Sequence, residues 1–240
     1  MFAYIVLEVR RTLRDRTFLV FGAGMPVMMY LLFTNLGGAG DYTDWKAASM
    51  VGMAAYGALG SAMAIGTGIA SDKSLGWLRQ LRITPLDPGR AVAGRAVSGV
   101  VTVLPAVLAV LLAGGLVNGV RLAVWQWAAL ALLLWAGSLP FTLLGIGNGY
   151  RLSPQGTGVV NVACLMGFGV LGGLWFPLTE FPGWLRTVGE LTPAHGFAEL
   201  GRATIAGHAP AAGPVAALAG WMLVFGGYAM ISYRRSARTE

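Results

Sequence analysis

The segment 76–90, GWLRQLRITPLDPGR, contains the residue types in this chain that are best suited to binding chemistry. It combines arginines with a tryptophan and prolines, and it lies between long windows without charged residues. Residues 77–84 fit a short amphipathic helix, because Gly76 precedes them and Pro85 ends the helical region. The arginines could contact lipid headgroups or a groove on another protein. The residues alone leave both uses open.

The composition indicates a membrane protein. The chain has 240 residues, of which 56% are hydrophobic and 11% are charged, whereas soluble domains are about 25% charged. Six windows lack charged residues, and each can hold the roughly 20 residues that a helix needs to cross a bilayer. We therefore predict an all-α integral membrane fold with six transmembrane helices near 18–36, 48–70, 97–117, 125–146, 158–176 and 213–232. Pro26, Pro105 and Pro140 should each kink or break a span.

The basic residues predict how these helices are oriented. Of the 17 Lys and Arg residues, 13 lie on the side of the two termini, which is therefore cytoplasmic by the positive-inside rule. Residues 1–16 place apolar side chains on one helical face, and they place Arg10, Arg11 and Arg14 on the other. This pattern is typical of an amphipathic helix on the membrane surface, with a plain basic flank as the alternative. Residues 17–240 then form a single domain.

Several functional classes are excluded. No predicted span contains Asp, Glu, Lys or Arg, which argues against a proton-driven carrier. The sequence has no P-loop, zinc motif or nucleophile elbow, so we expect no catalytic residue, no metal site and no cofactor on this chain. The single cysteine, Cys164, cannot form an intramolecular disulfide. The basic residues end apolar runs and form no patch with aromatic residues, which excludes nucleic-acid binding.

Methionine, aromatic and amide side chains in the spans could line a path for a lipophilic substrate. The candidates are Met25, Met28, Met29, Met53, Tyr56 and Asn161. The same residue types also form ordinary helix-bundle cores, so both interpretations stay open. Because the spans contain few polar residues, a small amphiphile or drug-like molecule is favoured over a glycan.

Two stretches resemble ABC-2 type transporter permeases, the membrane subunits of ATP-driven exporters. GWLRQLRITPL (76–86) is similar to the first cytoplasmic loop of the small bacterial members, and GLWFPLTEFPGWLRTVGELTPAHGFAELGR (173–202) to the segment before their last span. The resemblance covers nearly the whole chain. It implies a bacterial cell membrane protein that forms a homo- or heterodimer of permease chains. It also implies that each chain docks a cytoplasmic ATPase, which binds ATP and Mg.

The resemblance implies roles for three segments. The cytoplasmic loop 71–95 would hold a coupling helix that docks on the ATPase through Gly76, Trp77, Leu78, Arg79, Leu81, Arg82, Thr84 and Pro85. The helix 1–16 would be an interfacial gate helix. The segment 177–207 would form short external re-entrant helices that cap an outer gate. The external gate residues would be Trp175, Phe176, Pro177, Pro182, Trp184 and His195.

Charged residues distinguish the cytoplasmic loop and the predicted outer gate. Lys73 and Leu75 precede Gly-Trp where the family often has two acidic residues, which changes the local charge. Near the predicted outer gate, His195 and the acidic residues Glu180, Glu190 and Glu199 could form a pH-sensitive network or a solvated loop. The expected function is outward movement of a small amphiphilic, drug-like or lipid substrate. The alternatives are glycan or ion export by the same fold, and a membrane scaffold or channel without an ATPase.

Overall fold

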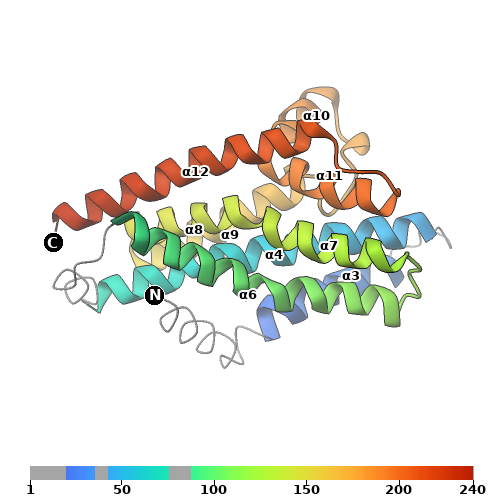
Figure 1. Ribbon diagram of the computed structural model, residues 1–240, viewed down its shortest axis with the longest axis horizontal. Helices are drawn as coiled ribbons and strands as arrows, with labels where there is room; N and C mark the ends of the chain where they lie inside the picture. The colour runs from blue at the N-terminus through green and yellow to red at the C-terminus, as the bar shows by residue number, and fades with distance from the viewer. Residues whose placement is uncertain (1–19, 36–42, 76–87, 240) are drawn as a thin grey trace.

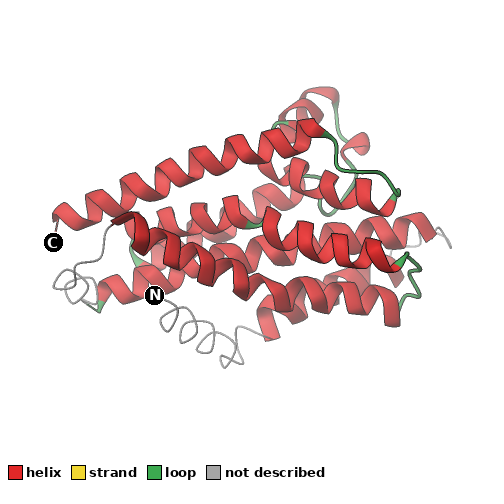
Figure 2. Ribbon diagram, in the orientation of Figure 1, coloured by secondary structure: helices red, strands yellow, loops and turns green. Residues whose placement is uncertain are grey.

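The computed structural model describes residues 20–35, 43–75 and 88–239 (Figure 1). Within these ranges every regular element is a helix (Figure 2), which confirms the all-α prediction. The first seven elements are η1 (Val20–Gly24), α3 (Met25–Asn35), α4 (Thr43–Ser74), α6 (Pro88–Leu116), α7 (Val124–Gly137), α8 (Leu139–Arg151) and α9 (Pro154–Leu171). They are followed by η2 (Leu178–Glu180), α10 (Gly183–Glu190), α11 (Pro193–Ile205) and α12 (Ala212–Thr239).

Within the described ranges, 5 helical segments are long and apolar enough to cross a membrane. They are Trp45–Ser74, Val92–Leu116, Val124–Arg151, Pro154–Leu171 and Ala212–Ser236. These segments correspond to the second through sixth predicted spans. The first predicted span is described from residue 20 onward, as the π-helix η1 followed by α3. The six-span count and the orientation therefore stay predictions.

The segment Val124–Arg151 is two helices joined at Ser138. α7 ends at Gly137, and α8 begins at Leu139 with Pro140 in its first turn. Proline is tolerated at this position because the first N–H groups of a helix have no intrahelical partner. The predicted break at Pro140 is therefore present. In contrast, Pro105 lies inside α6, which runs from Pro88 to Leu116.

α4 runs through the middle of the bundle, where it contacts α3, α6, α7, α8, α9 and α11. In the most apolar stretch of α4, 78% of the residues are buried within the chain, compared with 17% in α9 and 22% in α12. Small residues permit this close packing. A Cβ atom on Gly66 would overlap the carbonyl oxygen of Gly145 in α8. The largest fully buried side chains of the core include Tyr30, Met50, Met53, Leu59, Met63, Leu130, Leu134, Phe141 and Phe197.

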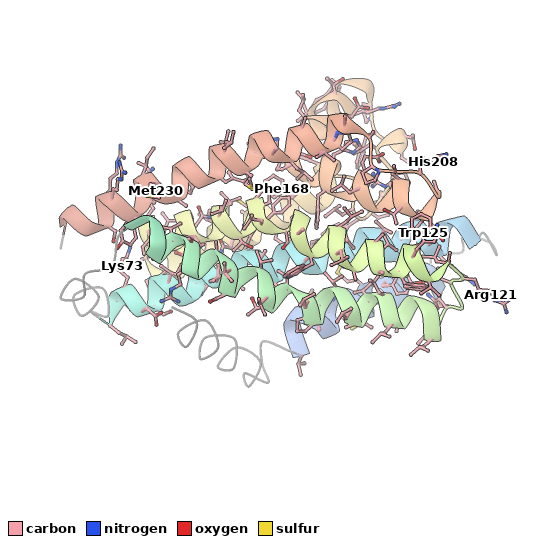
Figure 3. All side chains as sticks on the ribbon, in the orientation of Figure 1. Lys73, Arg121, Trp125, Phe168, His208 and Met230 are labelled. Carbon is pink, nitrogen blue, oxygen red and sulfur yellow. The ribbon has the colours of Figure 1, made fainter. Side chains whose placement is uncertain are left out.

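The bundle is elongated and has two different ends (Figure 1). At one end, η2, α10 and α11 form a compact cap, residues 173–206, beside the start of α4. We call this the cap end. At the other end, which we call the loop end, α4 and α12 finish and α6 begins. Figure 3 shows Lys73 at the loop end, and Arg121, Trp125 and His208 at the opposite end.

Candidate functional site

The cap begins with a reversal of the chain after α9. Gly173 has a φ of 68°, a left-handed conformation that glycine adopts without the steric penalty of a side chain. The reversal is closed by the Leu174 amide, which donates to the Gly169 carbonyl at 3.1 Å. The next two residues, Trp175 and Phe176, are therefore directed back against the bundle.

Aromatic pairs attach the start of the cap to the first spans. The rings of Trp175 and Tyr56 in α4 lie 5.3 Å apart at 63°, and those of Phe176 and Phe33 in α3 lie 5.7 Å apart at 74°. Both are edge-to-face arrangements, which aromatic rings favour. The structure thus brings two predicted gate residues, Trp175 and Phe176, into contact with helices that carry predicted path residues.

The remaining predicted gate residues lie at the starts of the cap helices. Pro177 and Pro182 directly precede η2 and α10, and Trp184 in the first turn of α10 is 71% exposed. His195 lies in the first turn of α11, where its backbone amide donates to the Thr192 hydroxyl at 3.3 Å. Thr192 is therefore the N-cap of α11. Pro177 and His195 line the same cavity as Trp175 and Phe176, whereas Pro182 and Trp184 do not.

Charged residues on α10 and α11 form two ion pairs within the cap. Arg186 Nε lies 2.9 Å from Glu190 Oε1, and Arg202 Nη1 lies 2.6 Å from Glu199 Oε1. Arg202 Nη2 also donates to the Gly173 carbonyl at 2.5 Å. Arg202 therefore ties α11 to the reversal after α9.

His195 is adjacent to both ion pairs. Burial lowers the pKa of its imidazole below the ordinary value of 6.5. Glu199 opposes this effect and Arg202 adds to it, while Glu190 and Arg186 make smaller contributions of the same two kinds. The imidazole is consequently neutral near pH 7.

A cavity of about 360 Å³ lies between the cap and the start of α4. It is lined mainly by Trp45 and Ser49, by residues 173–179, and by Arg186, Glu190, His195, Glu199 and Arg202. Sequence reasoning missed Trp45, Ser49 and Arg202. Helical spacing places residues 45 and 49 on one helical face and residues 195, 199 and 202 on another, but it does not show that the two faces meet.

The predicted path residues are distributed over several environments. Met25 and Met28 are 44% and 53% exposed on α3, and Met29 is half-buried against the core. Met53 and Tyr56 are buried in α4. None of the predicted path residues lines the cap cavity. Their role in a substrate path stays a prediction.

Asn161 takes part in a hydrogen-bonded chain across four helices. Its Nδ2 donates to the Met63 carbonyl in α4, and its Oδ1 accepts from Asn148 Nδ2 in α8, both at 2.9 Å. The Tyr228 hydroxyl in α12 donates to Asn148 Oδ1 at 3.0 Å. Each of these amide groups has partners within the bundle, as polar groups in membrane spans require.

At the loop end, polar side chains tie α4 to its neighbours. Lys73 Nζ donates to the carbonyls of Tyr150 and Leu152, both at 2.9 Å. These carbonyls lie at the end of α8, where cations are favoured. Asp72 Oδ2 accepts from Arg95 Nη2 of α6 at 2.7 Å, and both side chains are largely buried. Lys73 therefore has a structural contact at the position where the family often has an acid.

Two predicted sites fall on parts of the chain that the structure leaves undescribed. The coupling residues between Gly76 and Pro85 lie outside the described residues. The interfacial gate residues Arg10, Arg11 and Arg14 also lie outside them. Both assignments stay predictions.

Comparison with known proteins identifies the family. The family model described as ABC-2 type transporter matches residues 1–206. The chain belongs to the ABC-2 type transporter family. The Bacillus subtilis (strain 168) protein named "Putative transport permease YvfS" is 25% identical to it over 224 residues, which cover 92% of this chain and 91% of that protein.

Membership of the ABC-2 type transporter family assigns the chain to a broad functional class. It is a membrane subunit of a transporter, and such subunits in general work with an ABC ATPase. The matched region contains all of the described helices from α3 to α11, including the cap and its cavity. The cap is thus part of the ABC-2 domain, whereas α12 follows the matched region.

Proposed function

We propose that the chain is the permease subunit of an ATP-binding-cassette exporter in a bacterial cell membrane. It moves a small amphiphilic, drug-like or lipid substrate outward, and a separate cytoplasmic subunit hydrolyses ATP with Mg. Two permease chains, identical or different, form the membrane part. The family match over residues 1–206 carries this proposal, and the name of YvfS as a transport permease supports it.

The placement of charge in the described spans supports an external energy source. In α4, Lys46 lies near the start of the helix, and Asp72 and Lys73 lie near its end. Carriers that couple to protons or ions generally need an ionisable group near the middle of the membrane. An ATPase partner supplies the energy without such a group.

The contacts at the loop end suggest how movement of the ATPase reaches the bundle. The segment 76–87 connects α4 to α6, and the Asp72–Arg95 ion pair joins these two helices beside it. Lys73 joins α4 to the end of α8. A displacement of the loop is therefore passed to three helices together. Because α4 extends to Trp45 beside the cap cavity, the displacement also reaches the cap end.

Affinity purification of the tagged chain in mild detergent tests the proposal. We expect a P-loop ATPase to copurify in stoichiometric amount, as identified by mass spectrometry. The double variant Trp77→Ala/Arg79→Glu should lose the ATPase and its stimulated ATP hydrolysis. The matched control Trp125→Ala/Arg121→Glu makes the same changes at the opposite end of the bundle and should retain both.

Two results would contradict the proposal, the first as a whole and the second in its coupling assignment. The first is a folded homo-oligomer that copurifies with no ATPase, which would favour a channel or scaffold. The second is retention of the ATPase by the Trp77→Ala/Arg79→Glu variant, which would remove the coupling assignment of the segment 76–85 while leaving the family unchanged.

A further inference from the structure

A second cavity lies between α6 and α7 at the cap end, on the outside of the bundle. Its volume is about 460 Å³, and every residue that lines it is apolar. Leucines of α6 form one wall, and Trp127 and Ala131 of α7 form the other. Leu108, Leu112 and Leu116 on the first wall are 43%, 59% and 82% exposed. The cavity is therefore a groove that opens to the surroundings of the bundle, and we call it the α6–α7 groove.

Small residues give the groove its depth. Gly115 has no side chain, and the ring of Trp127 lies over it, so that a Cβ atom on Gly115 would be 3.3 Å from Trp127 Cη2. Ala131 follows one turn later on the same face of α7, with a methyl group where a longer side chain would fill the space. The groove is thus built into the packing of α6 against α7.

The length of the groove corresponds to one leaflet of a bilayer. Leu108 and Leu116 are eight positions apart, which is about 12 Å along a helix. The hydrocarbon core is about 30 Å thick, so each leaflet contributes about 15 Å. A partner helix that crosses the membrane would need a contact over about 20 residues. The groove therefore suits an acyl chain of one leaflet better than a spanning helix.

Tryptophan and arginine residues mark the level of the lipid headgroups at one end of the groove. Trp125 lies in the first turn of α7 and is 54% exposed, and exposed tryptophans are enriched at the membrane–water interface. Arg121 is exposed in the turn between α6 and α7, directly after the lining residue Val120. Both Arg121 and Trp125 lie at the end of the bundle (Figure 3). A lipid with its chain in the groove would place its headgroup near Arg121.

The charge of Arg121 is available to a ligand. Arg186 and Arg202 at the same end of the bundle each pair with a glutamate. Arg121, in contrast, takes part in none of the ion pairs of the described residues. A guanidinium group presents a planar fork of N–H donors that matches the oxygen atoms of a phosphate. A cation beside an apolar groove is complementary to a phospholipid, which joins a phosphate to apolar chains.

We propose that the α6–α7 groove is a binding site for an anionic phospholipid of the leaflet at the cap end. One acyl chain occupies the groove, and the phosphate contacts Arg121. The chain supplies van der Waals contacts to side chains that would otherwise line an unfilled space. The site goes beyond the proposed transport, because lipid binding requires neither ATP nor an ATPase. It lies at the opposite end of the bundle from the segment 76–87, so loss of the lipid leaves ATPase docking unchanged.

Native mass spectrometry of the delipidated full chain in detergent measures this binding directly. The probes are phosphatidylglycerol and phosphatidylcholine with the same acyl chains, each added in increasing amounts. We expect the chain to retain one phosphatidylglycerol at concentrations at which phosphatidylcholine is not retained. Lysophosphatidylglycerol should also be retained, because the groove takes a single acyl chain. Inorganic phosphate should not displace the lipid, because the groove binds the chain as well as the charge.

A matched pair of leucine variants locates the retained lipid. Leu112→Trp places a larger side chain in the groove and should weaken binding by about threefold or more, because the acyl chain loses van der Waals contacts. Leu132→Trp makes the same change at a residue of α7 that is also 59% exposed and lies outside the groove. It should leave binding unchanged. Both side chains are exposed, so both variants should keep the thermal midpoint of the parent protein.

Variants of Arg121 test the headgroup contact. Arg121→Gln should weaken binding of phosphatidylglycerol by about fivefold, the usual effect of one basic residue beside an anionic lipid surface. It should leave the weaker binding of phosphatidylcholine unchanged. Arg121→Lys keeps the charge and should retain most of the preference. Copurification of the ATPase with Arg121→Gln should be normal, so failure of the lipid site leaves the proposed function intact.

Four results would each overturn the lipid site. Equal retention of phosphatidylglycerol and phosphatidylcholine would remove the selection for an anionic headgroup. Unchanged binding by Leu112→Trp would place the lipid elsewhere on the chain. Displacement of the lipid by inorganic phosphate would identify a site for a free anion. A change of oligomeric state in Leu112→Trp, with no lipid retained by the parent protein, would identify the groove as an interface between copies of the chain.

Discussion

His195 is a half-buried histidine beside two Arg–Glu ion pairs of the cap. Glu199 and Arg202 face it from its own helix, and Glu190 and Arg186 face it from α10. Because the nearby charges oppose one another, burial remains the main influence and lowers the pKa of the imidazole. The neutral ring is therefore part of the stable folded cap.

This burial predicts how the stability of the protein depends on pH. Below the ordinary pKa of 6.5, the unfolded chain takes up a proton that the folded cap resists. The free energy of unfolding should thus fall as the pH drops from about 6.5 toward 5. His195→Gln should show a smaller fall in thermal midpoint over this interval.

The other histidine provides the control for this measurement. His208 is exposed at the same end of the molecule, so His208→Gln should retain the parent pH dependence. An unchanged slope in His195→Gln would show that burial of this imidazole does not influence stability.

Lys73 gives a second prediction for a single side chain. Its ammonium group donates to two carbonyls at the end of α8, and hydrogen bonds to charged groups contribute about 1.5–3 kcal/mol each. Lys73→Met keeps the alkyl stem and removes the charge, so it should lower the free energy of unfolding by about 1–3 kcal/mol. Lys73→Arg keeps donors and charge and should lose less. Equal thermal midpoints for Lys73→Met and the parent would contradict this role.

At the scale of the helices, the contact between α4 and α8 depends on glycines, which have no side chain. The backbone of α8 passes so close to Gly66 that the added methyl group of alanine would overlap the Gly145 carbonyl. Without a hydrophobic driving force between helices in lipid, this close van der Waals packing is a main source of association. The contact also lies beside the hydrogen-bonded chain that joins Met63, Asn161, Asn148 and Tyr228.

A pair of glycines on the same helix tests this contact. Gly66→Ala should lower the free energy of unfolding by about 1–3 kcal/mol, the usual effect of overpacking. Gly68→Ala is two residues away, where a Cβ meets no atom within 4 Å. It should leave the stability unchanged or raise it, because alanine favours the helix. Thermal unfolding in detergent measures both, and equal effects of the two variants would show that the α4–α8 approach is not close.

The elements differ in how far the sequence alone could predict them. Long windows without charge predict the spans, and Pro140 predicts the break between α7 and α8, because both signals are local. The cap cavity requires Trp45 to meet residues near 175 and 202, and no local pattern records that approach. Asn161 illustrates the same limit, since its bond to the Met63 carbonyl depends on helix packing.

At the scale of the whole molecule, the two ends of the bundle carry different charge. Five basic residues of the described helices lie near the loop end, and they are Lys73, Arg95, Arg151, Arg234 and Arg235. The cap end carries fewer basic residues, namely Lys46, Arg121, Arg186 and Arg202, and the last two each lie beside a glutamate. The positive-inside rule therefore predicts that the loop end is cytoplasmic and that the cap, with its cavity, faces outward.

Cysteine labelling in intact cells tests this orientation. Cys164 is the single native cysteine, so Cys164→Ala gives a background without thiols. His208→Cys places a thiol at the exposed cap end, and Leu75→Cys places one at a residue that is 82% exposed at the loop end. A membrane-impermeant maleimide should label residue 208 in intact cells and residue 75 only after permeabilisation. The opposite pattern would place the cap in the cytoplasm, and the segment 76–87 could then not reach a cytoplasmic ATPase.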